Sequence, residues 1–339
     1  MSGMMLAAVF RGEGNLALDE VPVPKISRPD DVLLEVEAAS ICGTDVHIVA
    51  VPPGYIATPN TILGHEYVGK ILEVGSGVTH LKPGDRVVVN PNIYCGHCVY
   101  CQNHMPNVCE NIIAIGIHSD GAFAKYSKVP AQQLHKISPR VPPEIAVFAE
   151  PLACVINGTQ AARIQPGETA VVLGAGPIGL LFTQMFKAAG AKVIVSEPTE
   201  LRRKYAGLSG ADIVVDPTTE NLEGVVRLET GIGADVVADV AGRLFADAVN
   251  LARKGGTVLV FGVNAGVRQE IQQCNITFKS LTIYGTWLAN ATFPQAVKVL
   301  ETGVLDLGKL VTHKVALTDI CKGIELLKSG EGVKIVVYP

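Results

Sequence analysis

Short runs of alternating apolar and polar residues, broken by glycine and proline, dominate residues 1–90. Turn sequences such as LKPGD separate these runs, and a cysteine-bearing stretch then leads into another such run. The pattern predicts a β-rich, barrel-like domain. Its predicted strands are rich in β-branched residues: VLLEVEAASI at 32–41, YVGKILEVG at 67–75, DRVVVN at 85–90 and GAFAKYSKV at 121–129.

The period of the apolar residues changes from about residue 155 onwards. Apolar runs of strand length now alternate with segments of helical periodicity, which predicts a parallel sheet covered by helices on both faces. The predicted strands are ETAVVLGAG at 168–176, KVIVSEP at 192–198, DIVVDP at 212–217, ADVVADVAG at 234–242, TVLVFGV at 257–263 and LTIYGTW at 281–287.

The tail of the chain returns to short β segments, KLVTHKVAL at 309–317 and VKIVVYP at 333–339, around a predicted helix. Short β segments at both ends of the chain indicate that the tail folds back onto the first domain. We therefore expect the sheet domain to be inserted into the other one. The expected boundaries are 1–154 with a cysteine lobe at 91–112, then 155–288 for the sheet domain, and 289–339 for a return segment.

Length and composition narrow the class of protein. A chain of 339 residues suits two domains of roughly 150 residues each. A hydrophobic content of 48% with 18% charged residues is typical of a packed globule. The net charge of −4 is spread without long runs of one sign, so we expect no nucleic-acid or membrane partner. The sequence shows no signal-peptide pattern and no long apolar span, so we expect a cytoplasmic protein.

Four of the eight cysteines crowd into residues 95–109. Cys95, Cys98, Cys101 and Cys109 have the spacing C-x2-C-x2-C-x7-C, and four thiolates so close together can close a tetrahedral zinc shell. A closed shell of this kind is structural. An iron–sulfur cluster is the rival interpretation, but the seven-residue gap and the lack of a second cluster motif favour zinc.

A glycine-rich turn opens the predicted sheet domain. Gly174, Gly176 and Gly179 form G-x-G-x-x-G between a strand and a helix, which is typical of a dinucleotide-binding site. Glu197 ends the second strand, where a carboxylate can bind the adenosine ribose hydroxyls and repel a 2′-phosphate. The sequence therefore favours NAD over NADP, although Arg202 and Arg203 lie nearby and an arginine can hold a 2′-phosphate.

A second group of metal-ligand residues is spread along the chain: Cys42, His47, His65, Glu66 and Glu150. Each of them has an ordinary structural explanation when it is taken singly. Together with a dinucleotide site and a zinc lobe, they indicate a catalytic metal centre with three protein ligands and one exchangeable position.

These motifs resemble the zinc-containing medium-chain alcohol dehydrogenase family, in its polyol and threonine dehydrogenase branch. The resemblance covers essentially the whole chain. It implies a GroES-like β-rich catalytic domain and an inserted Rossmann-fold, doubly wound parallel sheet, with the active site between them, in a homotetramer or homodimer. One departure is His104, where relatives commonly have glycine, so the lobe loop is expected to turn differently. The matching motifs are GHE-x2-G-x5-G-x2-V at 64–78, ICGTDVH at 41–47, the four-cysteine lobe, AEPLACV at 149–155 and GAGPIG at 174–179.

The resemblance also implies roles for individual residues. Cys42 and His65 would hold a catalytic zinc, with Glu66 or Glu150 as the third ligand. One carboxylate at a time is expected, because a thiolate and one carboxylate already neutralise the ion. Thr44 would accept the substrate proton and His47 would relay it. Two zinc ions per chain and NAD are the expected cofactors, and further residues expected at the NAD site are Pro177, Ile178, Arg202, Gly262, Val263 and Thr286.

The substrate is expected to be a secondary alcohol in a small polyol or sugar-like molecule. Animal sorbitol dehydrogenases carry an Arg-Tyr pair where this chain has Leu288-Ala289, which argues against sorbitol itself. L-threonine 3-dehydrogenase is the alternative activity on the same machinery. A non-catalytic zinc and dinucleotide scaffold is the alternative from another class, and a metal-free quinone reductase is disfavoured because the metal ligands are present.

Overall fold

The computed structural model describes residues 3–339, in which the chain forms two compact units. The first unit comprises the chain up to Ala153 with Asn290–Gly303 and Val311–Pro339; the second comprises Cys154–Ala289 and Val304–Leu310. Helix α4 (Ala149–Ala162) begins in the first unit and ends in the second. The assignment of segments 1–154, 155–288 and 289–339 to catalysis, cofactor binding and completion of the catalytic domain remains a proposal.

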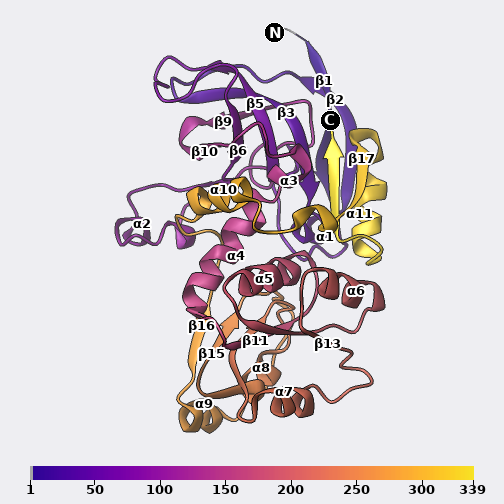
Figure 1. The fold of residues 1–339 in the computed structure, drawn as a ribbon. Helices are drawn as coiled ribbons and strands as arrows, with labels where there is room; N and C mark the ends of the chain where they lie inside the picture. The colour runs from indigo at the N-terminus through magenta and orange to yellow at the C-terminus, as the bar shows by residue number, and fades with distance from the viewer. Residues whose placement is uncertain (1–2) are drawn as a thin grey trace. The chain divides into compact units, whose positions relative to one another are not determined.

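Two sheets build the first unit (Figure 1). The larger has the order β10-β6-β5-β3-β18-β17, with β9 also paired to β3, and the smaller has the order β2-β1-β4. The C-terminal strand β18 lies antiparallel beside β3, so the tail of the chain joins the larger sheet next to a strand from residues 31–41. The bounds are β1 Met4–Gly12, β2 Asn15–Pro22, β3 Asp31–Ile41, β4 Thr61–Ile62, β5 Glu66–Val74, β6 Arg86–Val89, β9 Tyr126–Pro130, β10 Leu134–Lys136, β17 Val311–Ala316 and β18 Lys334–Tyr338.

Apolar side chains from both sheets form one core, in which Leu63, Tyr67 and Phe123 are almost fully buried. Strand β3 is buried along most of its length, which explains its near-continuous apolar sequence. Short helices complete the unit: α1 Gly43–Ile48, α3 Pro143–Ala146, α10 Phe293–Thr302 and α11 Ile320–Lys328, with one-turn 3-10 helices at Ala131–Gln133 and Leu317–Asp319.

The cysteine lobe, residues 91–112, is connected to the rest of the first unit by a two-stranded sheet, which we call the neck of the lobe. Strands β7 (Asn92–Ile93) and β8 (Ile113–Ala114) pair antiparallel and close the loop between them. Within that loop lie α2 (Val99–Gln102) and a 3-10 turn at Pro106–Val108. His104 has φ +59°, the left-handed conformation that favours glycine. The backbone of the lobe therefore makes a left-handed turn at this histidine.

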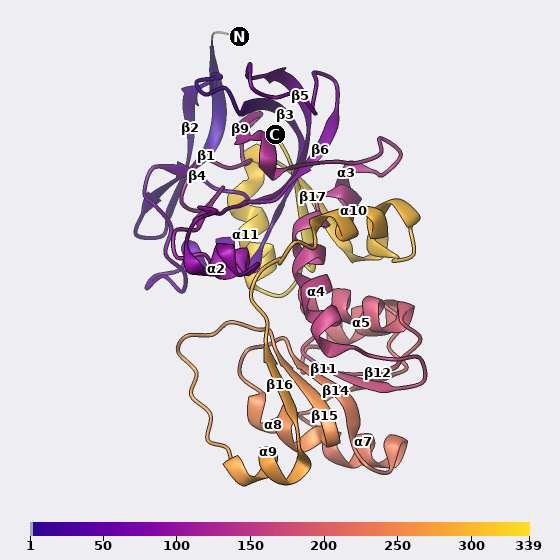
Figure 2. The same cartoon turned by 90° about the vertical axis from the view of Figure 1, so that its left-hand side faces the viewer.

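The second unit is a six-stranded sheet in the order β13-β12-β11-β14-β15-β16, with every pair parallel. Numbered from its first strand, the order is 3-2-1-4-5-6, that of a doubly wound dinucleotide-binding sheet. The crossover helices α5 and α8 lie on opposite faces of this sheet, as Figure 2 shows. The predicted fold class is confirmed. The bounds are β11 Thr169–Leu173, β12 Lys192–Ser196, β13 Ile213–Val215, β14 Ala234–Asp239, β15 Ala252–Val260, β16 Thr282–Gly285, α5 Pro177–Ala188, α6 Glu200–Leu208, α7 Leu222–Thr230, α8 Phe245–Leu251 and α9 Gln273–Lys279, with a 3-10 turn at Leu307–Leu310.

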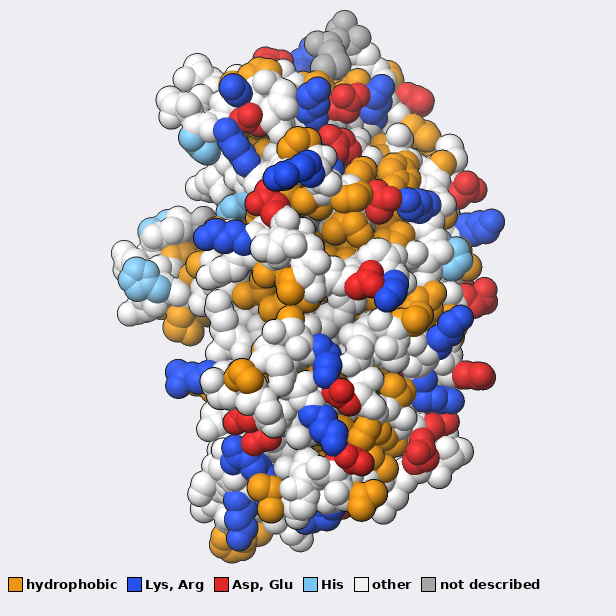
Figure 3. All heavy atoms as spheres, viewed as in Figure 1, with side chains coloured by type: hydrophobic (Ala, Val, Ile, Leu, Met, Phe, Trp, Pro, Cys, Tyr) orange, Lys and Arg blue, Asp and Glu red, His pale blue; other side chains and the backbone are white. Residues whose placement is uncertain are grey.

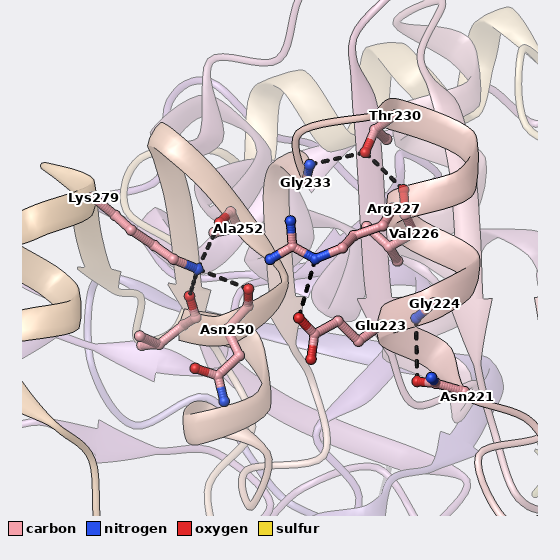
Figure 4. Close-up of polar contacts among 11 residues, drawn as sticks. Asn221, Glu223, Gly224, Val226, Arg227, Thr230, Gly233, Asn250, Ala252 and Lys279 are labelled. Atoms are coloured by element: carbon pink, nitrogen blue, oxygen red, sulfur yellow. Dashed lines mark hydrogen bonds and ion pairs between the residues drawn. The ribbon is translucent and has the colours of Figure 1, made fainter.

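A lysine terminates helix α8. The Lys279 ammonium at the end of α9 donates to the carbonyls of Val249, Asn250 and Ala252, at 2.9, 2.7 and 3.0 Å (Figure 4). A cation satisfies the free carbonyls that every helix leaves at its C-terminus. The arrangement borders a small cavity of about 120 Å³ and ties α9 to the β15 side of the sheet.

We expect Lys279→Met to lower the free energy of unfolding by about 2 kcal/mol, because three hydrogen bonds to a charged donor disappear and buried carbonyls lose their partner. Urea denaturation measures the change. Lys254→Met is the matched control, since that lysine is exposed beside the same cavity. Equal losses in the two variants would contradict the stabilising role of Lys279.

One segment, Pro143–Ala162, is long and apolar enough to cross a membrane by length and composition alone. In the folded chain, 72% of its apolar window is buried inside the protein. Its residues include the fully buried Leu152, Ala153 and Val155. Packing within the protein therefore accounts for the apolar character of this segment.

Candidate metal centre and cofactor site

Helix α1 begins at Cys42, which acts as its N-cap. The Cys42 sulfur accepts from the Thr44 backbone N–H at 3.5 Å, and the Cys42 backbone N–H donates to an Asp45 carboxylate oxygen at 2.8 Å. This reciprocal capping orients the thiol at the start of the helix. Thr44 and His47 lie three residues apart on α1, which brings them to one helix face. The Thr44 hydroxyl lies 3.6 Å from the Cys42 sulfur.

Asp45 and His65 form a buried pair behind the thiol. His65 Nδ1 lies 3.7 Å from an Asp45 carboxylate oxygen, and both side chains are almost fully buried. Burial raises the pKa of Asp45 to about 6, although His65 acts in the opposite direction. Burial alone would lower the pKa of His65, but Asp45, Cys42 and the nearby Glu150 raise it well above 6.5. The negatively charged groups around the His65 imidazole therefore favour a cation at this position, either the protonated ring or a bound metal ion.

The Glu66 carboxylate has two buried partners, Ser40 and Lys334, that the sequence analysis missed. Ser40 lies opposite Glu66 in the β3–β5 register and opposite Val336 in the β3–β18 register. Because side chains two residues apart share a face of a strand, Lys334 reaches the same place. The Ser40 hydroxyl donates to Glu66 at 2.5 Å, and the Lys334 ammonium forms an ion pair with the same carboxylate oxygen.

Metal-ligand atoms of Cys42, His65 and Glu66 all lie within 4.8 Å of one another. Glu150 is buried in the first turn of α4 and acts electrostatically on His65. Among the described residues, neither His65 Nδ1 nor Asp45 Oδ1 has a hydrogen-bond partner. A thiol, an imidazole and carboxylates in this arrangement fit a divalent cation such as zinc.

The four lobe cysteines also come together, with all sulfur atoms within 4.8 Å. Cys98 and Cys109 are 3.9 Å apart at sulfur, close to the separation of about 3.8 Å that a tetrahedral zinc–thiolate shell requires. Backbone N–H groups of Cys98 and Asn111 point at the sulfurs of Cys95 and Cys109. The His97 and Cys98 N–H groups lower the pKa of Cys95 to about 6. The lobe thus fits a structural metal ion.

In the second unit, each glycine of the G-x-G-x-x-G turn has its own structural reason. Gly174 has φ +109°, which a side chain would strain. A Cβ on Gly176, the N-cap of α5, would meet nothing within 4 Å, so the space beside this residue is open for a ligand to approach. A Cβ on Gly179 would lie 2.0 Å from the Gly174 carbonyl oxygen. The turn, the open approach and the close packing are those that a bound pyrophosphate requires.

Glu197 lies beside this turn and is buried. Its two carboxylate oxygens accept from the N–H groups of Ala175 and Thr199, both at 2.8 Å. Arg203 is engaged elsewhere, in an ion pair with Asp216 at 3.0 Å, whereas Arg202 lies half-buried on α6. Glu197 therefore both shapes the glycine turn and carries the negative charge next to it.

The loops after β14 and β15 line the same edge of the sheet. Buried Asp239 accepts from the backbone N–H groups of Ala241, Gly242 and Leu244. This brings Gly242 so close to Gly262 that a Cβ on Gly262 would lie 2.2 Å from the Gly242 nitrogen. Val263 follows and is exposed, while the hydroxyl of Thr286 after β16 is buried with no partner among residues 3–339.

Comparison with known proteins agrees with this geometry. Residues 28–139 match the alcohol dehydrogenase GroES-like domain, and residues 177–302 match the zinc-binding dehydrogenase domain. The chain is 36% identical over 359 residues to an L-threonine 3-dehydrogenase of Caldanaerobacter subterraneus subsp. tengcongensis, with 100% of both chains covered. The chain belongs to the zinc-dependent medium-chain dehydrogenase family.

Two further relatives show the range of this dehydrogenase family. A D-altritol 5-dehydrogenase of Agrobacterium fabrum is 37% identical over 324 residues, covering 93% of this chain and 94% of that one. A solved structure of a zinc-binding dehydrogenase from Sinorhizobium meliloti 1021, bound to NADP, superposes with a TM-score of 0.94 at 36% identity and covers 99% of this dehydrogenase and 100% of that chain.

Sequence reasoning missed four residues of these sites in this dehydrogenase: Ser40, Asp45, Lys334 and Asp239. Lys334 and Asp239 carried a usable signal, because each is a charged residue within an apolar strand and must find a partner when buried. Asp45 and Ser40 carried none, since a short polar residue in a loop or strand has many ordinary roles.

Proposed function

We propose that this dehydrogenase is a zinc-dependent, NAD-linked enzyme that oxidises a secondary alcohol of a small polyol or sugar-like substrate. The observation that carries the proposal is the convergence of Cys42, His65 and Glu66 within 4.8 Å, in a chain that also holds a glycine-rich dinucleotide turn. Zinc at this centre would acidify a bound hydroxyl, and NAD would accept the hydride. The protein itself holds the ligands and moves the proton.

Glu150 is the carboxylate that we assign to the metal. The negative charge of Glu66 is already neutralised by Lys334 and its oxygen is hydrogen-bonded to Ser40. Releasing Glu66 would leave the Lys334 ammonium buried without a partner, which is costly. Cys42, His65 and Glu150 then supply the three protein ligands, and Glu66 stays behind them.

Thr44 and His47 are suited to carry the proton away from the substrate. The Thr44 hydroxyl lies beside the Cys42 sulfur, where it can hydrogen-bond to a substrate hydroxyl at the metal centre. His47 lies one turn further along α1 and is exposed, so it can exchange protons with water. The Asp45 carboxylate lies 3.7 Å from His65 Nδ1, where it would favour one orientation of the ring by electrostatic attraction, as carboxylates do for metal-binding histidines.

A neutral polyol suits the site better than an amino acid. The buried ammonium of Lys334 lies against Glu66 and is already paired with its carboxylate. It is therefore not free to bind a substrate carboxylate. The altritol dehydrogenase relative supports this choice, while the threonine dehydrogenase relatives favour L-threonine 3-dehydrogenase as the second candidate function.

The deciding experiment measures NADH formation at 340 nm with pentitols, hexitols and L-threonine side by side. We expect turnover with a polyol and its loss after exhaustive chelation, with recovery on adding Zn²⁺. Turnover with L-threonine alone would replace the polyol assignment by the second candidate. Turnover that survives complete removal of zinc would overturn the metal-dependent mechanism.

A separate prediction concerns the choice between NAD and NADP. We expect Glu197→Gln to lower the ratio of kcat/KM for NAD to that for NADP at least about tenfold, because the charge that repels a 2′-phosphate is removed. Glu200→Gln, at the first residue of α6, is the control and should leave the ratio unchanged. A ratio that already favours NADP in the unmodified enzyme would contradict the assigned role of Glu197.

We further propose a cytoplasmic enzyme that assembles as a homotetramer or homodimer and binds neither nucleic acid nor membrane. The net charge of −4 without long runs of one sign supports the expected absence of nucleic-acid and membrane partners, and acidic and basic side chains are interspersed on the face drawn in Figure 3. Size-exclusion chromatography with light scattering would measure the oligomeric state.

A further inference from the structure

Three glycines pack backbone against backbone directly beside His65. Gly64, which precedes this histidine, has φ +94°, and Gly116 has φ +80°. A Cβ on Gly116 would lie 2.3 Å from the Gly64 carbonyl oxygen and 2.9 Å from the His65 nitrogen. A Cβ on Gly121 would lie 2.2 Å from the same carbonyl oxygen and 2.5 Å from the Gly116 Cα. Real Cβ atoms do not approach backbone atoms so closely, so side chains are excluded at both positions.

Hydrogen bonds join the same two segments of chain. The N–H groups of Gly121, Ala122 and Phe123 donate to the carbonyls of Ile62, Gly64 and Leu63 at 2.8, 2.9 and 2.9 Å. In return, the Ile62 N–H donates to an Asp120 carboxylate oxygen at 3.0 Å. Hydrogen bonds from residues 120–123 therefore hold the backbone of residues 62–64, which directly precedes His65.

The segment that contains residues 120–123 is continuous with the neck of the cysteine lobe. Strand β8 ends at Ala114, and the Ile115 N–H donates to the Pro91 carbonyl at 2.8 Å. Gly116 in turn donates to Ser119 at 2.6 Å, which closes the turn between the neck and Asp120. Residues 114–123 thus run without interruption from the lobe to the metal-ligand histidine.

We propose that the segment 114–123 is a positioning element for His65, in which Gly116 and Gly121 set the place of the imidazole by direct backbone contact with Gly64. The proposal rests on the proposed function only in taking His65 as a metal ligand. None of the residues 114–123 is assigned to the substrate or to the cofactor. It acts through the Gly64–His65 backbone, and a shift of that backbone would move the ring away from Cys42.

The test compares two glycine variants that introduce similar clashes in the same unit. Gly121→Ala forces a methyl group against the Gly64 carbonyl. Gly75→Ala forces one to within 2.4 Å of the Pro29 carbonyl oxygen, at the opposite end of strand β5 from His65. Neither glycine has a positive φ, so both substitutions act through space alone. Gly75→Ala therefore reports the effect of strain without displacement of His65.

The measured quantities are the dissociation constant for Co²⁺ and the visible absorption spectrum of the Co²⁺-loaded protein, restricted to the part of the spectrum that disappears in Cys42→Ala. We expect Gly121→Ala to weaken Co²⁺ binding at this centre about 10- to 100-fold and to shift its absorption bands, as changes behind metal ligands do. Gly75→Ala should leave both quantities unchanged.

Identical Co²⁺ affinity and spectra in Gly121→Ala and Gly75→Ala would overturn the proposal. If Gly121→Ala does not fold, Asp120→Ala replaces it, because this exposed side chain accepts the hydrogen bond from the Ile62 N–H and its truncation introduces no clash. An unchanged Co²⁺ spectrum and affinity in Asp120→Ala would then count against the proposal. Absence of any Cys42-dependent Co²⁺ band in the unmodified protein would instead reject the proposed metal centre itself, so the two failures are distinguishable.

Discussion

The Cys42→Ala variant is expected to lose at least about 1,000-fold in kcat/KM with the best substrate of the unmodified enzyme. The sulfur of Cys42 lies within 4.8 Å of the ligand atoms of His65 and Glu66, and it is one of the protein ligands that we assign to the metal. A metal that polarises a hydroxyl supplies several kcal/mol. A loss of about 4 kcal/mol corresponds to a factor of about 1,000. Steady-state kinetics measures the activity, and elemental analysis should show about one zinc ion per chain in place of about two.

Cys274→Ala is the matched control for this prediction, because it makes the same chemical change at an exposed cysteine of the second unit. It should retain both zinc ions and full activity. The dissociation constant for NAD should stay within about twofold in both variants, since the proposed cofactor residues lie in the second unit. A Cys42→Ala enzyme that keeps its rate would show that the thiolate does not hold the catalytic metal.

The Lys334→Met variant is expected to lower the free energy of unfolding by about 3–5 kcal/mol. Lys334 and Glu66 are each only 2% exposed at the side chain, and removal of one partner leaves the other charge buried and unpaired. Methionine is close to lysine in volume, so little of the loss comes from packing. Denaturation by urea, followed by circular dichroism, gives the change in stability.

The double variant Lys334→Met/Glu66→Gln should recover at least half of that loss, because the unpaired carboxylate is then neutral. Lys314→Met is the control at an exposed ion pair with Glu144 and should cost no more than about 1 kcal/mol. If Glu66 is instead a direct metal ligand, Glu66→Gln will add to the loss rather than relieve it. That result would contradict the assignment of Glu150 to the metal.

The cysteine lobe and the parallel sheet show how much local sequence can predict. The spacing of Cys95, Cys98, Cys101 and Cys109 confines four sulfurs to one loop, and the structure brings them within 4.8 Å. The alternation of apolar runs with helical segments predicted a doubly wound sheet, because buried parallel strands need near-continuous apolar sequence. The strand expected at 257–263 begins earlier than predicted, at Ala252, directly after helix α8 ends at Leu251, where Lys279 binds the neighbouring carbonyls.

The sequence by itself determined the class of this protein: a β-rich domain with an inserted dinucleotide-binding sheet and a set of metal-ligand residues. The sheet, the glycine turn and the cysteine lobe follow from periodicity and short-range spacing, which depend only on neighbours along the chain. The set of catalytic metal ligands, which is spread along the chain, came from the resemblance to a known family. Only the tertiary structure decided which charges meet. Lys334 and Glu66 are 268 positions apart in the sequence and meet because β18 pairs with β3. Asp45 of α1 meets His65, which directly precedes β5, only in the folded chain. Such pairings depend on sheet register and burial, which no local pattern encodes.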